Sequence, residues 1–423
     1  MECVDPLSLD PRHPRRVIVV GGGYAGLTFA VTLVNRTRAS DGIEVVLVDP
    51  RPYQQALSEL DLVAAGTARP QFAELWYADV LRGLPIKVVH QRMENVLPDE
   101  GVIQLGPRGT VVATIPYWRL VIATGAIASV PPIPGLEEHA ITMWSVADAM
   151  KLQRAIEKQF GYAARLTDPE AKHRALAVTV VGGGATGVEI IGTIAKRLPS
   201  MIRRAGHDPG QLSMTLIEAR SDILFDLPVS QRARARRRLE KMGVRLQMGR
   251  KLVAVDDTTA HLEGGIDVPS PVLVWAGGAH ADPDAISWQL MCERSGRLAI
   301  DQNLKATGTD AIYAVGDVAA FRDPKDNHVL PMLAQFAIRE AEHAAVSVLG
   351  EARGVEPKPF APNMHGEFVS VGPGWGVGWM FGVNVSGWFA IVMKRLTYVV
   401  YWMGVGSYRL AWKRTVQMLQ LRR

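Results

Sequence analysis

The stretch Val17-Ile18-Val19-Val20-Gly21-Gly22-Gly23-Tyr24-Ala25-Gly26 decides the fold of this 423-residue chain. Its four apolar, β-branched residues are typical of a buried strand, and the run 27–33 that follows is typical of a helix. Gly21, Gly23 and Gly26 have the G-x-G-x-x-G spacing, which permits a tight turn, a close backbone approach to a pyrophosphate and close packing of helix on strand. The helix N-terminus then offers unpaired N–H groups and a favourable dipole to the phosphates.

An acidic residue completes this unit. Residues 44–48 are predicted to form a second strand that ends in Asp49, at about the spacing expected of a ligand to a ribose hydroxyl. A glycine-rich turn without a ligand explains the glycines but not the strand, helix and acid around them. The sequence therefore predicts a dinucleotide site, with Tyr24 and Ala25 among its contacts.

The same arrangement recurs in the middle of the chain. It comprises a strand at 178–181, Gly182, Gly184 and Gly187 at the same spacing, a helix at 188–198 and a strand at 214–217 that ends in Glu218. Two complete fingerprints in one chain imply two bound nucleotides.

Two further strands end in small or acidic residues that can reach the first nucleotide. The strand at 120–123 leads into Thr124-Gly125, and the strand at 311–315 leads into Gly316-Asp317. Asp317 can bond ribityl hydroxyls or lie near the phosphates, although an aspartate is also common at a simple strand end. The predicted cofactor-binding residues are Gly21, Gly23, Tyr24, Ala25, Gly26, Asp49, Ala123, Thr124, Gly125, Gly182, Gly184, Ala185, Thr186, Gly187, Glu218, Ala276, Gly277, Gly316, Asp317, Ala334 and Gln335.

The fold class that follows is α/β, with two Rossmann-like three-layer dinucleotide-binding domains and a C-terminal region of strands and amphipathic helices. The expected division is a flexible leader at 1–14, a discontinuous first nucleotide domain at 15–130 and 279–350, a second nucleotide domain at 131–278 and a C-terminal region at 351–423. Residues 54–82 are expected to be helical. The chain has only two cysteines, in no metal-ligand pattern, so neither a disulfide framework nor a metal site is expected.

The C-terminal region carries cations but no acids. The chain as a whole has a formal charge of +5, and residues 368–423 contain no Asp or Glu. The glycines between 372 and 387 favour strands and turns. Residues 388–403 predict a helix with Lys394 and Tyr401 opposite its apolar face, and a last helix follows with Arg414 outside its apolar stripe. Basic amphipathic helices with Trp and Tyr typically lie on a membrane surface, although such stripes can also pack on the protein or form a dimer.

The order of these motifs resembles the two-dinucleotide-fold flavoproteins, which bind FAD in the first fold and a nicotinamide nucleotide in the second. Within them, the chain most resembles the type II (non-proton-pumping) NADH:quinone oxidoreductases. This narrower resemblance rests on the stretches 22–27 (GGYAGL), 63–66 (VAAG), 184–189 (GATGVE) and 331–337 (PMLAQFA). It implies that NADH gives a hydride to FAD and that electrons pass on to a quinone, either menaquinone or ubiquinone.

The resemblance also implies roles for three residues. Gln335 would lie by the quinone and flavin, Glu189 between the nicotinamide site and a proton route, and Lys394 near both. Glu189 is also favourable simply as an acid in the first turn of a helix. Arg339 departs from the family pattern, which often has Gln there, and a fixed cation at that place leaves the acceptor open.

Further expectations concern partners and cofactor choice. Glu218 favours NADH over NADPH, because a carboxylate repels a 2′-phosphate, while Arg220 can blunt that preference. The protein is expected at the cytoplasmic face of the cell membrane, peripheral or monotopic, as a possible homodimer and without nucleic acid. Two alternatives stay open: reduction of a soluble protein or small-molecule acceptor, and a non-enzymatic flavin or nucleotide sensor.

Overall fold

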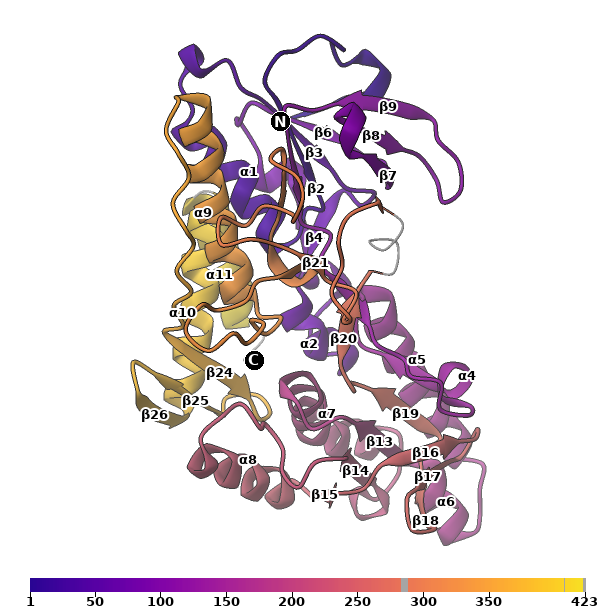
Figure 1. Cartoon of the computed structure of the whole chain (residues 1–423). Helices are drawn as coiled ribbons and strands as arrows, with labels where there is room; N and C mark the ends of the chain where they lie inside the picture. The colour runs from indigo at the N-terminus through magenta and orange to yellow at the C-terminus, as the bar shows by residue number, and fades with distance from the viewer. Residues whose placement is uncertain (283–287, 407, 421–423) are drawn as a thin grey trace.

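Two parallel sheets form the frame of the molecule. The computed structural model describes residues 1–282, 288–406 and 408–420, excluding the side chains of residues 419 and 420. The first sheet has six strands in the order β1-β6-β3-β2-β10-β22, and its members pair in parallel. Their bounds are Glu2–Cys3, Ile86–Val89, Glu44–Val48, Arg16–Val20, Arg119–Ile122 and Ile312–Ala314. The sheet lies in the upper half of Figure 1.

The second sheet lies in the lower half of Figure 1 and has five parallel strands in the order β12-β19-β13-β14-β15. Their bounds are Ala140–Thr142, Val272–Trp275, Ala177–Val181, Ser213–Glu218 and Val244–Met248. Runs such as Val178–Val181 are buried along their whole length because helices cover parallel sheets. The predicted fold class, with two Rossmann-like units, is confirmed.

Helices flank both sheets. Beside the first sheet, α1 (Tyr24–Arg36) packs on α9 (Ala334–Ala352). Around the second sheet lie α5 (Val146–Ala163), α7 (Ala185–Arg204) and α8 (Val229–Lys241). The shorter helices are α4 (Leu136–His139) and α6 (Pro169–Ala175), and the smaller sheets are formed by β7 (Met93–Leu97), β8 (Val102–Leu105) and β9 (Ala113–Pro116), by β16 (Leu252–Val255), β17 (Thr259–Leu262) and β18 (Ile266–Pro269), and by β21 (Leu298–Ala299) and β23 (Ala319–Ala320).

The chain passes between the two sheets through a short antiparallel ribbon. Strand β11 (Ala126–Ala128) pairs with β20 (Ala279–Ala281), and Trp275 Nε1 donates to Ser129 O at 2.6 Å beside it. The outgoing and returning strands are therefore neighbours. The domain boundaries themselves remain a prediction, and this pairing lies next to two of them.

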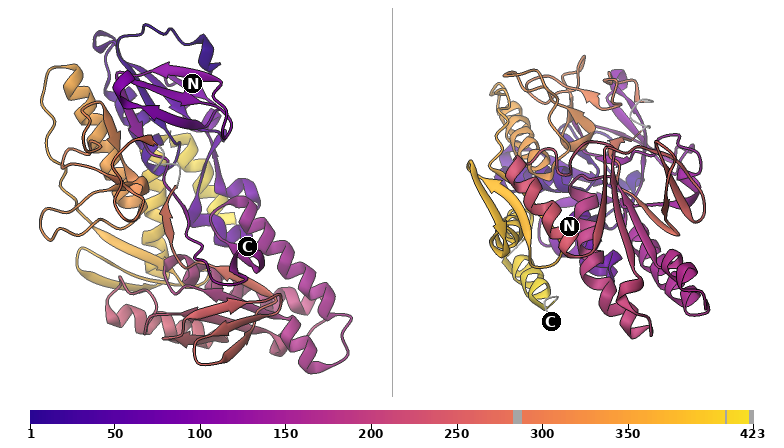
Figure 2. Two further views of the ribbon diagram at one scale, coloured as in Figure 1. Left: turned by 45° about the vertical axis from the view of Figure 1, so that its right-hand side comes forward. Right: turned by 90° about the horizontal axis from the view of Figure 1, so that it is seen from below.

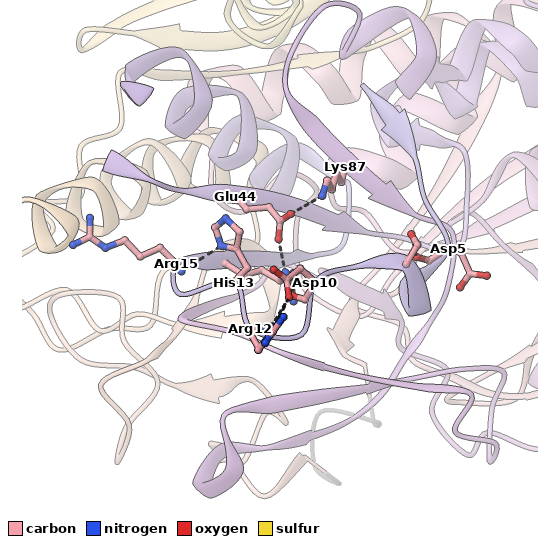
Figure 3. Close-up of polar contacts among 9 residues, drawn as sticks. Asp5, Asp10, Arg12, His13, Arg15, Glu44 and Lys87 are labelled. Atoms are coloured by element: carbon pink, nitrogen blue, oxygen red, sulfur yellow. Dashed lines mark hydrogen bonds and ion pairs between the residues drawn. The ribbon is translucent and has the colours of Figure 1, made fainter. Parts of the chain in front are cut away.

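Residues 1–14 differ from the expected flexible leader. Strand β1 pairs with β6 at the edge of the first sheet, and Asp10 O accepts a hydrogen bond from Arg16 Nη2 at 2.5 Å. Glu44 binds Arg16 Nε at 2.5 Å and Lys87 Nζ at 2.6 Å, and Figure 3 shows the contact with Lys87. These contacts arise because the sheet edge offers unpaired backbone groups and the buried Arg16 needs acceptors.

Residues 54–82 also differ from expectation. The predicted helical stretch consists of β4 (Tyr53–Gln55) and β5 (Glu74–Trp76) with the short helices α2 (Leu60–Ala64) and α3 (Tyr77–Val80). Strands β4 and β5 pair with each other, and α2 packs on α5 and α7. Strand pairing and packing on the second nucleotide unit, rather than the helical spacing of the apolar residues, thus decide the structure of this segment.

The C-terminal region contains a three-stranded antiparallel sheet and two helices. The sheet consists of β24 (Gly366–Ser370), β25 (Gly376–Met380) and β26 (Val383–Gly387), so the predicted strands and turns are confirmed. Helices α10 (Trp388–Val405) and α11 (Tyr408–Gln420) follow, and Figure 2 shows them in yellow along the flank of the molecule.

Helix α10 buries residues from both faces that the sequence distinguishes: Ile391 and Trp402 of the predicted apolar face are 5% and 3% exposed. Tyr401 is buried and Lys394 is mostly buried, whereas Leu396 is 50% exposed. The polar side chains lie inward because other elements supply their hydrogen-bond partners: Glu189 of α7 binds Lys394, and Gln54 of β4 binds Tyr401. In α11 the predicted outward residue Arg414 is likewise buried, for the same reason.

Candidate nucleotide and redox site

The first glycine turn has room for a ligand at one position and none at the other two. A Cβ on Gly21, which has φ +95°, would lie 2.4 Å from Ala123 O, and one on Gly26 would lie 1.7 Å from Gly21 O. A Cβ on Gly23 would meet nothing within 4 Å. Gly21 and Gly26 are thus required by packing, while Gly23 keeps open the space at the helix start where a pyrophosphate fits.

Asp49 is fixed beside this turn by the backbone. Its carboxylate is buried and accepts hydrogen bonds from Gly22 N at 2.7 Å and from Arg51 N at 2.8 Å. The predicted ribose ligand is therefore held at the end of β3 next to the open space at Gly23. Tyr24 and Ala25 open α1 at the same place.

The second glycine turn repeats this geometry. A Cβ on Gly182 would lie 2.3 Å from Ala276 O and one on Gly187 would lie 1.9 Å from Gly182 O, while Gly184 again faces open space. Glu218 accepts from Gly183 N at 2.6 Å and from Arg220 N at 2.7 Å, as Asp49 does in the first turn. The two glycine turns therefore have the same backbone geometry, with the same open position and the same acid contact.

The other predicted residues lie around the same openings. Ala185 and Thr186 are exposed at the start of α7. Gly277 follows Ala276, and a Cβ on Gly277 would lie 2.2 Å from the Trp275 ring. At the end of β10, Gly125 has φ +77°, and Thr124 Oγ1 is buried without a hydrogen-bond partner among the described residues. An orphaned hydroxyl at this strand end fits a cofactor that supplies the missing partner.

Asp317 lies in a buried polar cluster at the end of β22. Gly316 N donates to Glu340 Oε2 at 2.7 Å, and Arg297 donates to Leu330 O at 2.8 Å and to Ala319 O. Burial raises the pKa of Asp317, and the nearby Arg297 opposes that shift. Burial also raises the pKa of Glu340 to about 8. The predicted Gly316-Asp317 turn is thus held in place by Glu340 of α9, which accepts from Gly316 N.

Glu189 and Lys394 meet, although 205 residues separate them. Glu189 Oε1 accepts from Lys394 Nζ and from Ser370 N, the latter at 2.8 Å. Burial by itself would lower the pKa of Lys394, but Glu189, Tyr398 and Asp61 together raise it. The lysine is therefore charged and bound to a carboxylate.

Gln335 lies at the other end of β24. With its amide oriented to satisfy both contacts, it donates to Gly366 O at 3.0 Å and accepts from His365 N at 3.1 Å. Because Ser370 at the far end of β24 binds Glu189, one strand joins the two predicted residues. Gln335 does not contact Glu189 or Lys394 directly in any hydrogen bond among the described residues.

Two acids near Lys394, the half-buried Asp61 and the buried Glu59, were not predicted. Asp61 accepts from Thr193 Oγ1 at 2.7 Å, and burial, with Glu189, raises its pKa to about 6. Glu59 accepts from Arg414 Nη2 at 2.6 Å, and burial raises its pKa to about 7. The signal that could have found them is two acids within the mostly apolar stretch 57–65.

Tyrosines close the same region. Tyr401 Oη donates to Gln54 Oε1 at 2.8 Å, and its ring lies 4.9 Å from the ring of Tyr24 in the first fingerprint. Tyr24 Oη lies 3.3 Å from Ser58 Oγ. Helix α10 is thus tied directly to the first glycine turn.

A family model for pyridine nucleotide-disulphide oxidoreductases matches residues 15–341, which contain both glycine turns. The chain belongs to this family. Among the described residues, neither Cys3 nor Cys292 is part of a disulfide, and the two are far apart in the sequence. Membership therefore rests on the nucleotide-binding frame and not on a disulfide.

Relatives narrow the comparison. The type II NADH:quinone oxidoreductase of Staphylococcus haemolyticus is 28% identical, over 95% of this chain and 98% of its own length. That of Staphylococcus aureus strain NCTC 8325 is also 28% identical, over 95% and 98%. The stated resemblance to this group is confirmed.

Solved structures share the fold. NDH2 from Plasmodium falciparum in complex with NADH superposes with a TM-score of 0.84 at 15% identity, over 96% of this chain and 98% of that one. The sulfide:quinone oxidoreductase of Aquifex aeolicus gives 0.75 at 17% identity, over 92% of each chain. In the described part of the present chain, no helix has the length and hydropathy that are needed to cross a bilayer.

Proposed function

We propose that this protein is an FAD-dependent NADH:quinone oxidoreductase. The observation that carries the proposal is the duplicated glycine turn, each with an open position at its helix start and an acid bonded to its backbone. The relatives named above, which match nearly the whole chain, support NADH as donor and a quinone as acceptor.

The residues around the first turn fit FAD. Gly23 leaves room for the pyrophosphate, Asp49 for the ribose, and the orphaned Thr124 hydroxyl and Asp317 for the remaining polar groups. Bound FAD supplies acceptance of a hydride from NADH and delivery of the electrons to the acceptor. The α9 N-terminus, beginning at Ala334, would favour negative charge developing beside it.

The second turn would hold NADH. Gly184, Ala185 and Thr186 offer backbone N–H groups to the pyrophosphate, and Glu218 would accept from the ribose 2′-hydroxyl. Both carboxylate oxygens of Glu218 already bind backbone N–H groups, so a 2′-phosphate would meet a fixed negative charge. This arrangement supports a preference for NADH.

Glu189, Lys394 and Gln335 would serve the acceptor side. Lys394 would orient the Glu189 side chain, and Glu189 would pass protons between the acceptor side and Asp61. Gln335 would donate or accept a hydrogen bond at the acceptor by exchanging its contacts with β24. In this scheme Tyr24 and Tyr401 exclude water between the acceptor site and the first turn.

Membrane association through the C-terminal helices is part of the proposal. Outward apolar side chains lie along α10 and α11, namely Trp388, Phe389, Leu396, Val400, Met403, Tyr408 and Trp412. These residues, together with exposed cations such as Arg409, fit a helix lying in an interface. We place the protein at the cytoplasmic face of the membrane, as a peripheral or monotopic protein, and a homodimer through the same region is compatible.

The test is NADH oxidation by purified, FAD-loaded protein in liposomes, with and without quinone. The proposal expects rapid, quinone-dependent oxidation of NADH. Reduction of the bound flavin by NADH without reoxidation by any quinone would contradict the acceptor and favour a soluble one. Absence of bound FAD after reconstitution would contradict the whole proposal.

A further inference from the structure

Helix α8 belongs to the second nucleotide unit and is strongly basic. Six of its thirteen residues are Arg or Lys, and one is Glu. Three of the cations are engaged: Arg232 bonds Leu227 O at 2.6 Å, Arg236 pairs with Asp222 at 3.4 Å, and Arg238 lies 5.6 Å from the centre of the Trp375 ring. The other three remain outward.

Those three share one stripe of the helix. Arg234, Arg237 and Lys241 are all exposed, and with Ser230 they follow the i, i+4, i+7, i+11 spacing of a single helix face. No ion pair joins any of the three to an acid within the described part of the chain. The opposite face, with Ala235 and Leu239, is buried. The stripe is thus a row of unneutralised charge.

The stripe begins beside the C-terminal sheet. Arg234 Nη1 donates to Ser386 Oγ at 3.4 Å, and Asn384 Nδ2 donates to Ser230 Oγ at 3.3 Å. Helix α8 packs on β25 and β26, and Figure 1 shows these elements together at the lower left of the molecule. The charged row therefore continues from the edge strand that leads into α10.

The hairpin between β25 and β26 ends in an exposed aromatic residue. Phe381 is 70% and Val383 64% exposed. Phe381 has φ +48° and Gly382 has φ +79°, which fits a two-residue turn whose first position normally takes Asn or Asp. A phenylalanine in that conformation is strained, and apart from the His365 ring, whose centre lies 5.2 Å away, the Phe381 ring faces water, so a contact outside the chain would compensate for its cost.

We infer that the hairpin tip (Phe381 and Val383) and the α8 stripe (Arg234, Arg237 and Lys241) together bind a bilayer containing anionic lipids. The tip would enter the interface, and the stripe would lie over the phosphate headgroups. Charge complementarity favours this occupant, since a row of cations beside an apolar edge matches acyl chains beneath anionic headgroups. The surface is continuous with the outward residue Trp388 at the start of α10.

This inference rests on the proposed function, because that function places α10 and α11 on a membrane. It adds that the second nucleotide unit is also docked there. NADH would then bind to a unit whose position over the bilayer is fixed at two places, α8 and the C-terminal helices.

The experiment is co-sedimentation of the FAD-loaded full chain with phosphatidylcholine vesicles, with and without phosphatidylglycerol. The variant Arg234→Gln/Arg237→Gln should bind anionic vesicles about 25-fold more weakly, at about fivefold per cation, and neutral vesicles equally well. The matched control Arg165→Gln/Arg174→Gln removes two exposed cations from the α5–α6 end and should bind like the wild type.

A second pair of variants tests the tip. Phe381→Asn/Val383→Thr keeps the turn and strand preferences and should weaken binding to both vesicle types about tenfold or more. Val111→Thr/Val112→Thr, at an exposed loop before β9, is its control.

Unchanged binding of the arginine variant to anionic vesicles would overturn the role of α8, and unchanged binding of the tip variant would overturn that of the hairpin. Dimerisation lost with the tip variant, with vesicle binding intact, would instead assign the surface to a second copy. Oxidation of NADH with a water-soluble quinone, measured without vesicles on every variant, separates these outcomes from failure of the proposed function.

Discussion

The buried ion pair between Glu59 and Arg414 should decide whether α11 stays docked. The two side chains are 4% and 5% exposed, and Arg414 Nη2 also donates to Phe72 O at 2.5 Å. The guanidinium lies 4.8 Å from the centre of the Phe72 ring and 5.3 Å from that of Trp402. Removing Glu59 leaves a buried cation that cannot lose its proton, which typically costs about 3–5 kcal/mol.

The reverse change should be milder. Arg414→Met leaves a carboxyl whose pKa burial already raises to about 7, so Glu59 can take a proton instead of remaining charged. We expect Glu59→Leu to lower the opening free energy of α11 by about 3 kcal/mol and Arg414→Met by less. The double variant Glu59→Leu/Arg414→Met should recover most of the loss, because no unpaired charge remains.

The assay is amide hydrogen exchange in α11, which reads local opening in a chain of several units. Flavin absorbance of each variant checks that the first nucleotide unit is intact. Equal exchange in Glu59→Leu and the wild type would refute the reasoning, as would a double variant that loses the sum of the single effects.

Three other predictions follow from the site. Gly23→Ala should change the stability of the apo-protein by no more than about 0.5 kcal/mol but lower its affinity for FAD at least tenfold. Gly26→Ala should destabilise the fold by more than about 2 kcal/mol, because its Cβ would lie 1.7 Å from Gly21 O; fluorescence titration with FAD and thermal unfolding distinguish the two effects. Burial raises the pKa of Glu340 from 4.5 to about 8, so its contribution to stability is full below about pH 4.5 and is lost as pH rises to about 8. The wild type should therefore lose stability relative to Glu340→Gln over that range, and a constant difference between their melting temperatures would contradict this. Lys394→Met should slow quinone-dependent turnover at least tenfold while NADH-dependent flavin reduction in stopped flow stays within about twofold, and equal loss of both steps would count against a role at the acceptor.

The features that the sequence predicts well are local. Each glycine turn, its helix and the acid after the next strand lie within about forty residues, and their spacing alone encodes the geometry. Asp49 and Glu218 accordingly occupy equivalent positions, each accepting a hydrogen bond from the backbone N–H that follows the first glycine of its turn, Gly22 N and Gly183 N. The family resemblance that these motifs support is confirmed.

What the sequence does not predict depends on distant partners. Residues 388–403 predict a helix with Lys394 and Tyr401 opposite its apolar face, but the inward position of these two side chains depends on Glu189 and Gln54, which bind them. Residues 54–82 contain helical spacing, yet the strand pairing of β4 with β5 overrides it. The contacts of Lys394 and Tyr401 join residues 205 and 347 positions apart, and Tyr53 of β4 pairs with Trp76 of β5; no local periodicity reports these contacts.

The ribbon of β11 and β20 has a consequence for the history and engineering of this chain. Ala128 and Ala279 are directly opposite each other in the antiparallel pair, so their Cα atoms lie about 5 Å apart. A tight Asn-Gly turn could join them and excise the 150 or so residues between, leaving the first sheet unthreaded and its strand order intact. The second nucleotide unit is thus an insertion whose two chain connections lie side by side, and an excised chain would lose the packing of α5 and α7 on α2 and of α7 and α8 on the C-terminal sheet.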